Sequence, residues 1–373
     1  MEGLGTRRAG AAVERLIAGY RGDGPAPALR DRDDVAAYAA YRMPATFQAV
    51  RAALSALADA APGWAPDSHL DVGGGTGAAL WAAAAVWPED GPRPTVVLDH
   101  SEPALALGRE LAAGAAAPAV RAAQWRREAL GAAGSGWVRN QPADDTRFRQ
   151  PGGSRGRPAD ASAGGPTGGS AHGPAVGSAD GTAGSAWAPA GLVTVSYVLG
   201  ELSEDVRRDV VAEAARSARG SVVVVEPGTP HGYRRVLAAR QQLVDAGYEV
   251  LAPCPHSAAC PMEGTADWCH FAARVQRSAL HRRVKGGELG HEDEKFAYVA
   301  AARIPAGKPA PARVVRHPQL RKGQVLLELC TAGEGLARTT VSKRQGPRYR
   351  AARDVRWGDA WPPPGEGDGH EGV

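Results

Sequence analysis

The chain has only four cysteines among its 373 residues, and it has no run of 18 apolar residues. So few cysteines exclude the dense disulfide framework of small secreted domains. The longest apolar stretch, about ten residues at 78–87, is too short to cross a bilayer. Residues 1–10 lack the apolar core of a secretory signal peptide after Arg7 and Arg8. We therefore expect a soluble, cytoplasmic protein that makes no contact with a membrane.

The composition is that of a globular protein, but its charge is unevenly distributed. Apolar residues make up 43% and charged residues 23% of the chain, which excludes collagen-like and fully disordered proteins. The net charge is only +4, yet residues 274–356 hold 19 Lys and Arg against 7 Asp and Glu, whereas the rest of the chain holds 25 against 33. Such a basic C-terminal third favours a polyanionic partner, because clustered cations release counterions from phosphates. A merely solvated face is the alternative.

Apolar residues follow helical spacing near the N-terminus and form short continuous runs after it. Phe47, Val50, Leu54 and Leu57 recur every three or four residues after Pro44, so we expect an amphipathic helix there. Runs without alternation lie at 69–73, 95–99, 192–199 and 221–227. Strands that are buried on both faces of a sheet show no alternation, so these runs predict a mostly parallel sheet with helices between its strands. The expected fold class is therefore α/β.

The sequence also indicates where one part of the chain gives way to the next. We assign an N-terminal helical region to residues 1–60, a core domain to 61–250, a Cys-rich segment to 251–303, a basic β element to 304–360 and a disordered tail to 361–373. Within the core, residues 131–190 hold 14 glycines and no periodic apolar pattern. We predict a disordered insertion there, because such a composition cannot offset the entropy of ordering. A third core strand is expected near 119–125, and C-terminal strands are expected at 313–315 and 324–329.

A glycine-rich loop, Asp71-Val72-Gly73-Gly74-Gly75-Thr76-Gly77, follows the first predicted strand and precedes an apolar helix. Glycines are needed because the turn requires positive φ and because side chains would keep a ligand away from the N–H groups at the helix N-terminus. Three interpretations of this loop are open. The ligand is S-adenosylmethionine, or it is a nicotinamide dinucleotide, because Gly73, Gly75 and Ala78 also fit the pattern G-x-G-x-x-G/A. In the third interpretation the pocket is vestigial and empty.

The acid that opens this loop and the acid that ends the second strand favour S-adenosylmethionine. Asp71, the G-x-G-x-G spacing of Gly73, Gly75 and Gly77, and Asp99 together resemble class I methyltransferases. That resemblance implies that Asp71 lies near the methionine amino group and that Asp99 accepts both ribose hydroxyls. The cofactor-binding residues are thus expected to be Asp71, Gly73, Gly75, Gly77 and Asp99.

No residue for methyl transfer can be identified. The Asn-Pro-Pro-aromatic tetrad of amine methyltransferases is absent, and the fourth predicted strand ends in Ser196-Tyr197-Val198-Leu199-Gly200-Glu201-Leu202. Glu201 is a proton acceptor or, more simply, a negative charge that opens the next helix. Residues 226–230, Glu-Pro-Gly-Thr-Pro, form a wall of the acceptor pocket or only a turn.

The four cysteines are Cys254, Cys260, Cys269 and Cys330, of which three share a short segment rich in Pro and His. Disulfides are not expected in a protein without an export signal, which leaves buried thiols, zinc, or iron and sulfur. Structural zinc usually takes C-x2-4-C knuckles, which are absent, although His256 and His270 offer further ligands. Four thiolates at wide, irregular spacing suit a cubane cluster.

Several motifs together resemble one family, the methyltransferase-like proteins of the mitochondrial small ribosomal subunit, which also has bacterial members. They are Tyr41-Arg42-Met43-Pro44, the glycine loop, the residues 195–202 and 226–230, Ala252-Pro253-Cys254-Pro255-His256, Trp268-Cys269-His270-Phe271 and the residues 292–298. The resemblance covers about residues 35 to 358. It implies a class I methyltransferase fold with a Rossmann-like, mostly parallel sheet, a pocket for S-adenosylmethionine and a role in small-subunit assembly or translation. It also implies a 4Fe-4S cluster on Cys254, Cys260, Cys269 and Cys330.

Two functions from different classes remain. The chain is a methyltransferase that modifies ribosomal RNA, or it is a non-catalytic assembly factor that holds small-subunit RNA and carries a structural cluster or zinc. In either case we expect a monomer whose RNA contacts come from seven C-terminal cations: Arg338, Lys343, Arg344, Arg348, Arg350, Arg353 and Arg356. Tyr349 and Trp357 lie among them and are expected to stack on unpaired bases.

Overall fold

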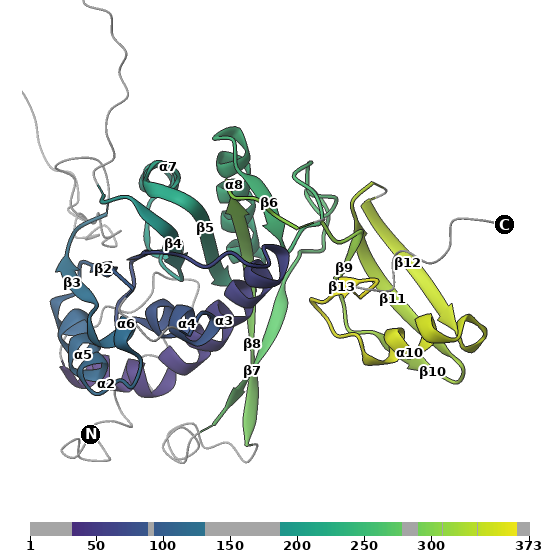
Figure 1. The fold of residues 1–373 in the computed structure, drawn as a ribbon, viewed down its shortest axis with the longest axis horizontal. Coiled ribbons are helices and arrows are strands. Elements are labelled where there is room, and N and C mark those ends of the chain that lie inside the picture. The colour runs from purple at the N-terminus through teal and green to yellow at the C-terminus, as the bar shows by residue number, and fades with distance from the viewer. Residues whose placement is uncertain are drawn as a thin grey trace, which may run out of the picture. The chain divides into compact units, whose positions relative to one another are not determined.

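A computed structural model of the chain describes residues 32–88, 93–130, 187–277, 290–307, 309–333 and 335–363. All of them belong to one compact unit, made of Met1–Arg139 and Ser185–Val373. The described residues form an eight-stranded sheet flanked by helices and a smaller five-stranded sheet near the C-terminus (Figure 1). No helix in the described ranges is both long and apolar enough to span a bilayer.

The larger sheet is built from strands in the order β3-β2-β1-β4-β5-β8-β6, with β7 paired to β8. Their bounds are β1 His69–Val72, β2 Thr95–Asp99, β3 Gln124–Arg127, β4 Ala190–Ser196, β5 Ala218–Pro227, β6 Glu249–Ala252, β7 Phe271–Gln276 and β8 His291–Ala302. Strands β1 to β5 are parallel, whereas β8 runs antiparallel to β5, β6 and β7. This order is that of a class I methyltransferase fold, so the predicted fold class is confirmed.

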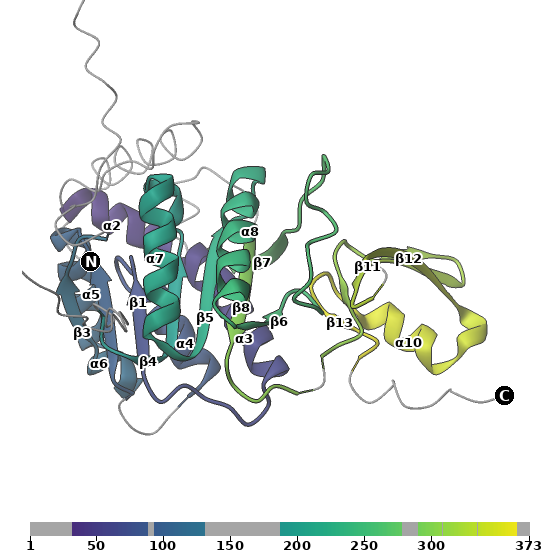
Figure 2. The same ribbon diagram turned by 90° about the horizontal axis from the view of Figure 1, so that it is seen from above.

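Helices cover both faces of this sheet, as Figure 2 shows. Their bounds are α2 Arg32–Tyr41, α3 Met43–Ala60, α4 Ala78–Val86, α5 Glu102–Ala113, α6 Pro118–Arg121, α7 Glu204–Ser217 and α8 Pro230–Asp245, with a 3-10 turn η1 at Leu199–Glu201. Successive strand residues point to opposite faces, so Val193 and Val195 pack toward α7 and α8 while Leu192 packs toward α3 and α4. All seven residues of β4 are buried, which explains the absence of apolar alternation in its sequence.

The sequence predicted strands β1 to β5 but not β6, β7 and β8, and it misjudged some borders. The third strand is β3, a few residues later than expected, after the short helix α6. Residues 131–186 of the predicted insertion lie outside the described residues. Its last four residues do not fit the prediction, because Trp187 is buried and hydrogen-bonds Glu128 and Glu213, and β4 begins at Ala190. The insertion follows β3, which is the edge strand of the sheet.

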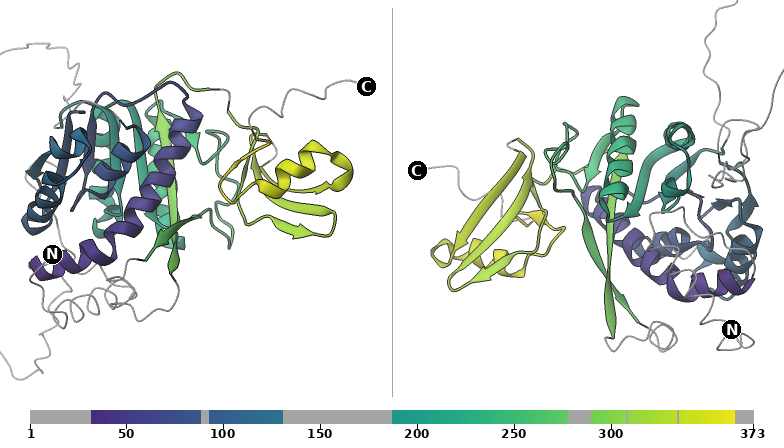
Figure 3. Two further views of the ribbon diagram at one scale, coloured as in Figure 1. Left: turned by 60° about the horizontal axis from the view of Figure 1, so that its bottom comes forward. Right: turned by 180° about the vertical axis from the view of Figure 1, so that it is seen from behind.

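The predicted Cys-rich segment, 251–303, is not separate from the core. It contains β7 and β8, and β8 lies between β5 and β6 in the main sheet. The first half of β8 pairs with β7 alone, so the two form a ribbon that extends past the other strands (Figure 3). Only the loop between β6 and β7 carries the three clustered cysteines.

The C-terminal sheet has the order β10-β11-β9-β13, and β12 pairs with β11. Its elements are β9 Ala312–Val314, β10 Gln319–Arg321, β11 Gln324–Thr331, β12 Gly335–Ser342, the 3-10 turn η2 Lys343–Gln345, α10 Pro347–Asp354 and β13 Ala360–Trp361. A small core that includes Val325, Leu327 and Val341 joins α10 to one face of the sheet. The tail predicted to be disordered from 361 begins too early, because Trp361 is buried in β13. Residues 364–373 lie outside the described part.

Candidate functional site

The glycine loop lies at the carboxyl end of β1 and leads into α4. Gly73, Gly75 and Gly77 adopt φ angles of +67°, +54° and +86°, which are costly for any residue with a Cβ. A Cβ on Gly73 would lie 2.6 Å from the side chain of Val198. At Gly75 the nearest protein atom would be Asp99 Oδ2, 3.8 Å away. The glycines at 73 and 75 therefore differ in function: the first allows close packing, and the second leaves open space beside the loop.

Asp99 closes the loop from the neighbouring strand. Its Oδ2 accepts a hydrogen bond from the Gly75 N–H at 2.9 Å, and its Oδ1 accepts one from the Ser101 N–H at 2.8 Å. The side chain of Ser101 in turn caps α5. Asp99 is thus fixed at the end of β2, as the sequence predicted, in contact with the backbone of the loop.

Asp71 is fully buried beneath the loop. Its Oδ1 accepts a hydrogen bond from the Thr194 hydroxyl at 2.8 Å, and that hydroxyl lies 2.8 Å from His69 Nε2. A Cβ on Gly74 would come within 2.5 Å of Asp71 Oδ2. Burial raises the pKa of Asp71 to about 7, and the nearby negative charge of Asp99 adds to this rise. Asp71 therefore supports the loop from within the sheet.

A half-buried polar cluster was not singled out from the sequence. The two terminal guanidinium nitrogens of Arg42, between α2 and α3, donate to the Glu294 carboxylate at 2.7 and 2.8 Å. The Tyr197 hydroxyl donates to the same carboxylate at 3.0 Å, and the Arg42 guanidinium lies 5.2 Å from the centre of the Tyr197 ring. Tyr197 has a φ of +57°, alone among the described residues other than glycine. Arg42, Tyr197 and Glu294 occur in three of the family motifs, and that was the available signal.

The acid after β5 is also internal. Glu226 is fully buried, accepts a hydrogen bond from the Leu199 N–H at 3.0 Å, and pairs with Arg235 at 2.6 Å. Burial raises the pKa of Glu226, while the charge of Arg235 opposes that rise. Glu226 therefore anchors the segment after β4 and does not line an acceptor pocket. Glu201 lies exposed in η1.

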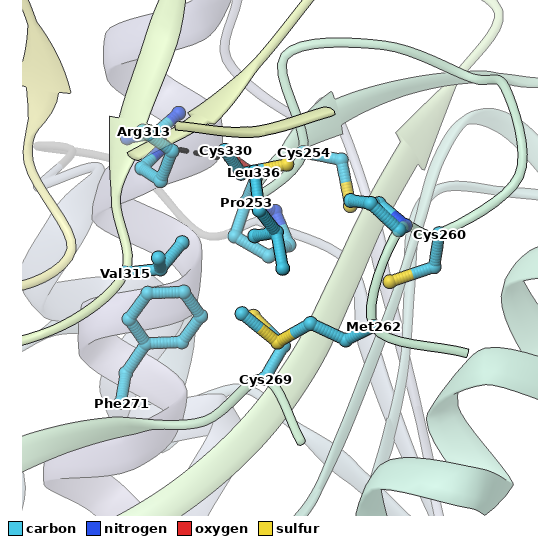
Figure 4. A pocket seen from close by; sticks show the side chains of 11 residues that line it. Pro253, Cys254, Cys260, Met262, Cys269, Phe271, Arg313, Val315, Cys330 and Leu336 are labelled. Atoms are coloured by element: carbon cyan, nitrogen blue, oxygen red, sulfur yellow. Dashed lines mark hydrogen bonds between the residues drawn. The ribbon is translucent and has the colours of Figure 1, made fainter. Parts of the chain in front are cut away.

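The four cysteines come together around one pocket (Figure 4). Cys254, Cys260 and Cys269 come from the loop between β6 and β7, and Cys330 comes from β11 of the C-terminal sheet. Arg313 of β9 donates to the carbonyl oxygen of Pro253 at 2.8 Å, which ties this sheet to the cysteine loop.

The thiols are close enough to affect one another. The pKa of Cys269 is raised well above its ordinary value, first by burial and then by the charges of the other three cysteines. The pKa of Cys330 is raised to about 12, again mainly by burial. The Tyr233 hydroxyl lies 3.3 Å from Cys260 Sγ, and His256 Nε2 lies 3.7 Å from Cys330 Sγ. In the described part of the chain, no three His, Cys, Asp or Glu side chains converge in a way that would hold a single metal ion.

His270 does not line this pocket. Its ring stacks on Trp268, with centroids 5.3 Å apart, and meets the Trp357 ring edge-on at 4.9 Å. Trp357 also contacts His317 at 4.7 Å. The Trp357 ring therefore packs within this aromatic cluster, and its stacking on unpaired bases stays a prediction. Tyr349 packs against the small core of the C-terminal domain, the name used here for residues 309–363.

The seven predicted RNA-binding cations are all exposed, but they do not share one face. Arg338 pairs in register with Glu328, which alternates along β11 with the core residues Leu327 and Leu329, so Arg338 lies on the face away from α10. The other cations lie in or directly after η2 and α10: Lys343, Arg344, Arg348, Arg350, Arg353 and Arg356.

Comparisons with known proteins agree with the motifs. The chain is 26% identical to the human mitochondrial ribosome assembly protein METTL17 over 342 residues, which cover 87% of this chain and 62% of that protein. It is 27% identical to the mitochondrial Rsm22-cox11 tandem protein 2 of Schizosaccharomyces pombe over 187 residues, 38% of this chain and 24% of that protein. The chain thus spans less than two thirds of the length of these relatives.

The chain also shows weak similarity to solved structures, two of which are named here. One is the magnesium protoporphyrin IX methyltransferase of Synechocystis PCC 6803 with bound SAH, at 11% identity and a TM-score of 0.36, covering 80% of this chain and all of that one. Another is the plantazolicin methyltransferase BpumL with SAH, at 9% identity and a TM-score of 0.33, covering 80% and 97%.

A family model also matches the chain on both sides of the predicted insertion. The model described as mitochondrial small ribosomal subunit Rsm22 matches residues 32–135 and 180–362. These two ranges make up most of the chain and include both the glycine loop and all four cysteines. The chain therefore belongs to the Rsm22 family of the mitochondrial small ribosomal subunit.

Proposed function

We propose that this protein is a cytoplasmic, monomeric assembly factor of the small ribosomal subunit with a methyltransferase-like fold. It binds S-adenosylmethionine at the glycine loop, carries a 4Fe-4S cluster on its four cysteines, and contacts ribosomal RNA through its basic C-terminal domain. The observation that carries the proposal is the convergence of Cys330 with three cysteines more than 60 residues earlier in the chain, in a protein that also keeps its glycine loop.

The loop supports S-adenosylmethionine as its ligand. Gly75 has space beside it, and its backbone is held by Asp99 at the end of β2. A carboxylate at this position is suited to accept hydrogen bonds from ribose hydroxyls. The N-terminus of α4 follows Gly77 directly, and the positive end of the helix dipole favours an anionic group of the ligand there.

The cysteine pocket supports a cluster more than zinc. Burial and the charges of neighbouring cysteines raise the pKa of Cys254, Cys269 and Cys330, so their thiolates are unfavourable unless a metal centre compensates the charge. Structural zinc usually takes C-x2-4-C knuckles with sulfur atoms at about 2.3 Å, and the four cysteines lack that spacing. A cluster holds its ligands farther apart. Cys254, Cys260, Cys269 and Cys330 would hold it, and the bound cluster would cross-link the C-terminal sheet to the core.

One set of contacts favours binding without methyl transfer, as the second candidate function. At the ends of β4 and β5, Tyr197 is bonded to Glu294, and Glu226 is bonded to Arg235 and Leu199. Each of these polar side chains already has a partner inside the protein. A proton acceptor for a substrate would have to be released from such a pair first.

Isothermal titration calorimetry tests the cofactor. We expect Gly75→Val to abolish S-adenosylmethionine binding, because the side chain would enter the space beside the loop, where a Cβ would lie 3.8 Å from the nearest protein atom. Gly63→Val is the matched control: Gly63 also has positive φ and open surroundings, but it lies outside the loop. Asp99→Ala should weaken binding by about 1.5 to 3 kcal/mol. Equal affinity in wild type and Gly75→Val would overturn the assignment.

Anaerobic purification tests the cluster. We expect brown protein with about four irons and four sulfides per chain. Cys330→Ser should lose the cluster, whereas His256→Ala should keep it. Colourless protein with one zinc per chain would contradict the cluster, and full iron content in Cys330→Ser would make His256 the fourth ligand.

Crosslinking in cells tests the ribosomal role. We expect crosslinks to small-subunit RNA, and we would map RNA methylation at the crosslinked sites with and without the gene. If cells without the gene lack a methyl group on the RNA, and the Gly75→Val variant does not restore it, the protein is an enzyme. Unchanged methylation together with defective subunit assembly would establish the binding factor. Absence of crosslinks to small-subunit RNA would contradict both.

A further inference from the structure

We propose that four cations at one end of the C-terminal sheet form a single binding site for an unpaired RNA strand. The site, here called the basic tip, consists of Arg321, Lys322, Lys343 and Arg344. The inference rests on the proposed RNA-binding function of this domain. It goes further because it adds Arg321 and Lys322, which lie outside the predicted cations at 338–356, and excludes most of α10.

Tertiary structure brings the two pairs together. Arg321 ends β10 and Lys322 begins the turn to β11, whereas Lys343 and Arg344 form most of η2. The Lys343 N–H donates to the carbonyl oxygen of Gly323 at 2.9 Å, so the two turns are in direct contact. Figure 1 shows β10 and the end of β12 at the same end of this sheet. A capping box between Ser342 and Gln345 fixes the backbone of η2.

The charges of the basic tip are not neutralised within the protein. All four side chains are exposed, and none forms an ion pair with a described residue. The one partner of Arg321 in this part of the chain is the neutral Gln319, at 3.5 Å. Elsewhere even exposed arginines have carboxylate partners, for example Arg219 with Asp67 and Arg274 with Asp293.

The spacing makes the four charges act together. Neighbouring strands lie about 4.8 Å apart, so β10 and β12 on either side of β11 are separated by about 10 Å. This is close to the Debye length at physiological salt. The potentials of the four cations therefore add before salt screens them, as a chain of phosphates requires.

An exposed apolar side chain beside the basic tip indicates RNA over a simple polyanion. Leu320, adjacent to Arg321, is 63% exposed, more than any other large apolar residue in the described ranges. An unpaired strand offers apolar base faces as well as phosphates, whereas paired RNA hides its bases. Leu320 can contact such a base while the neighbouring cations pair with the backbone.

Fluorescence anisotropy with the full chain and an unstructured 20-nucleotide RNA between 50 and 300 mM KCl tests the site. Near 100 mM KCl we expect Arg321→Glu/Lys322→Glu to weaken binding by at least about 10-fold and to flatten the salt slope by about 1.4, because two contacts to a single strand are lost. The matched control is Arg350→Glu/Arg353→Glu, which makes the same charge change on exposed residues of α10. This control should weaken binding less than 3-fold.

Leu320→Ser separates the two components of the site. It should weaken RNA binding at least 3-fold and leave binding of inorganic polyphosphate unchanged.

Equal losses in the tip and α10 double variants would overturn the proposal, as would wild-type affinity in the tip variant. Near-ultraviolet circular dichroism establishes that each variant is folded. If the wild type crosslinks to ribosomal RNA in cells and the tip variant does so equally, the basic tip fails while the proposed function stands. Tip-dependent crosslinks to an acidic protein alone would also overturn the RNA assignment.

Discussion

The methyltransferase-like core and the C-terminal domain use the same residue, arginine, in opposite ways. In the core, Arg42 pairs with Glu294, Arg235 with Glu226 and Arg277 with Glu292, and in each pair both side chains are largely buried. Residues 309–363 hold 11 Lys and Arg against 4 Asp and Glu. The cations of this C-terminal domain that lie in η2 and α10 form no ion pairs with described residues.

Burial determines whether a charged side chain contributes to the stability of the protein or to the binding of a partner. A buried pair fixes the position of the elements that carry it, and losing one partner leaves an uncompensated charge in a poorly polarisable environment. An exposed cation contributes little to stability, but its field extends to a partner. We therefore expect substitutions in the core to affect folding, and substitutions in the C-terminal domain to affect binding.

The largest effect should come from breaking a core pair. Glu226→Gln should lower the free energy of unfolding by about 3 kcal/mol. The substitution removes the negative charge that pairs with Arg235 and that accepts the hydrogen bond from the Leu199 N–H. Urea denaturation measures this. Asp67→Asn, which breaks the exposed pair with Arg219, should cost less than about 1 kcal/mol. Similar losses in both variants would remove the distinction between buried and exposed pairs.

A smaller effect should appear as a pH dependence of the core. Burial raises the pKa of Asp71 to about 7, above its value of about 4 in the unfolded chain. Between these values the folded protein holds a proton that the unfolded chain has lost, so stability falls as pH rises. The slope is up to about 1.4 kcal/mol per pH unit.

Asp71→Asn isolates this contribution, because the amide oxygen can still accept from Thr194. Urea denaturation of cofactor-free protein at pH 5, 6 and 7 should show a less negative slope in the variant than in the wild type. Parallel curves would mean that Asp71 stays ionised in the folded protein.

The smallest effect on stability is expected in the C-terminal domain. Arg350→Ser and Arg353→Ser should each change the free energy of unfolding by no more than about 0.5 kcal/mol, because both side chains are exposed and neither forms an ion pair with a described residue. Thermal denaturation at fixed cluster content measures this. A loss above 1 kcal/mol would show that these arginines stabilise the domain.

Local sequence patterns predicted where strands β1 to β5 lie along the chain, the position of the glycine loop and the acid at the end of β2. These features depend on local patterns: runs of buried β-branched residues, glycines where φ must be positive, and a turn at the end of each parallel strand. They require no knowledge of distant contacts. The fold class could therefore be predicted, as could the residues next to the loop.

Which residues far apart in the sequence come into contact depends on the tertiary structure. Cys330 joins the other cysteines because β11 pairs with β9, whose Arg313 holds the cysteine loop. The same kind of contact sets Tyr197 against Glu294 and Lys322 beside Lys343. Such pairs are separated by 20 to 100 residues, and no periodicity along the chain encodes them, because they are set by the packing of sheets and turns against one another.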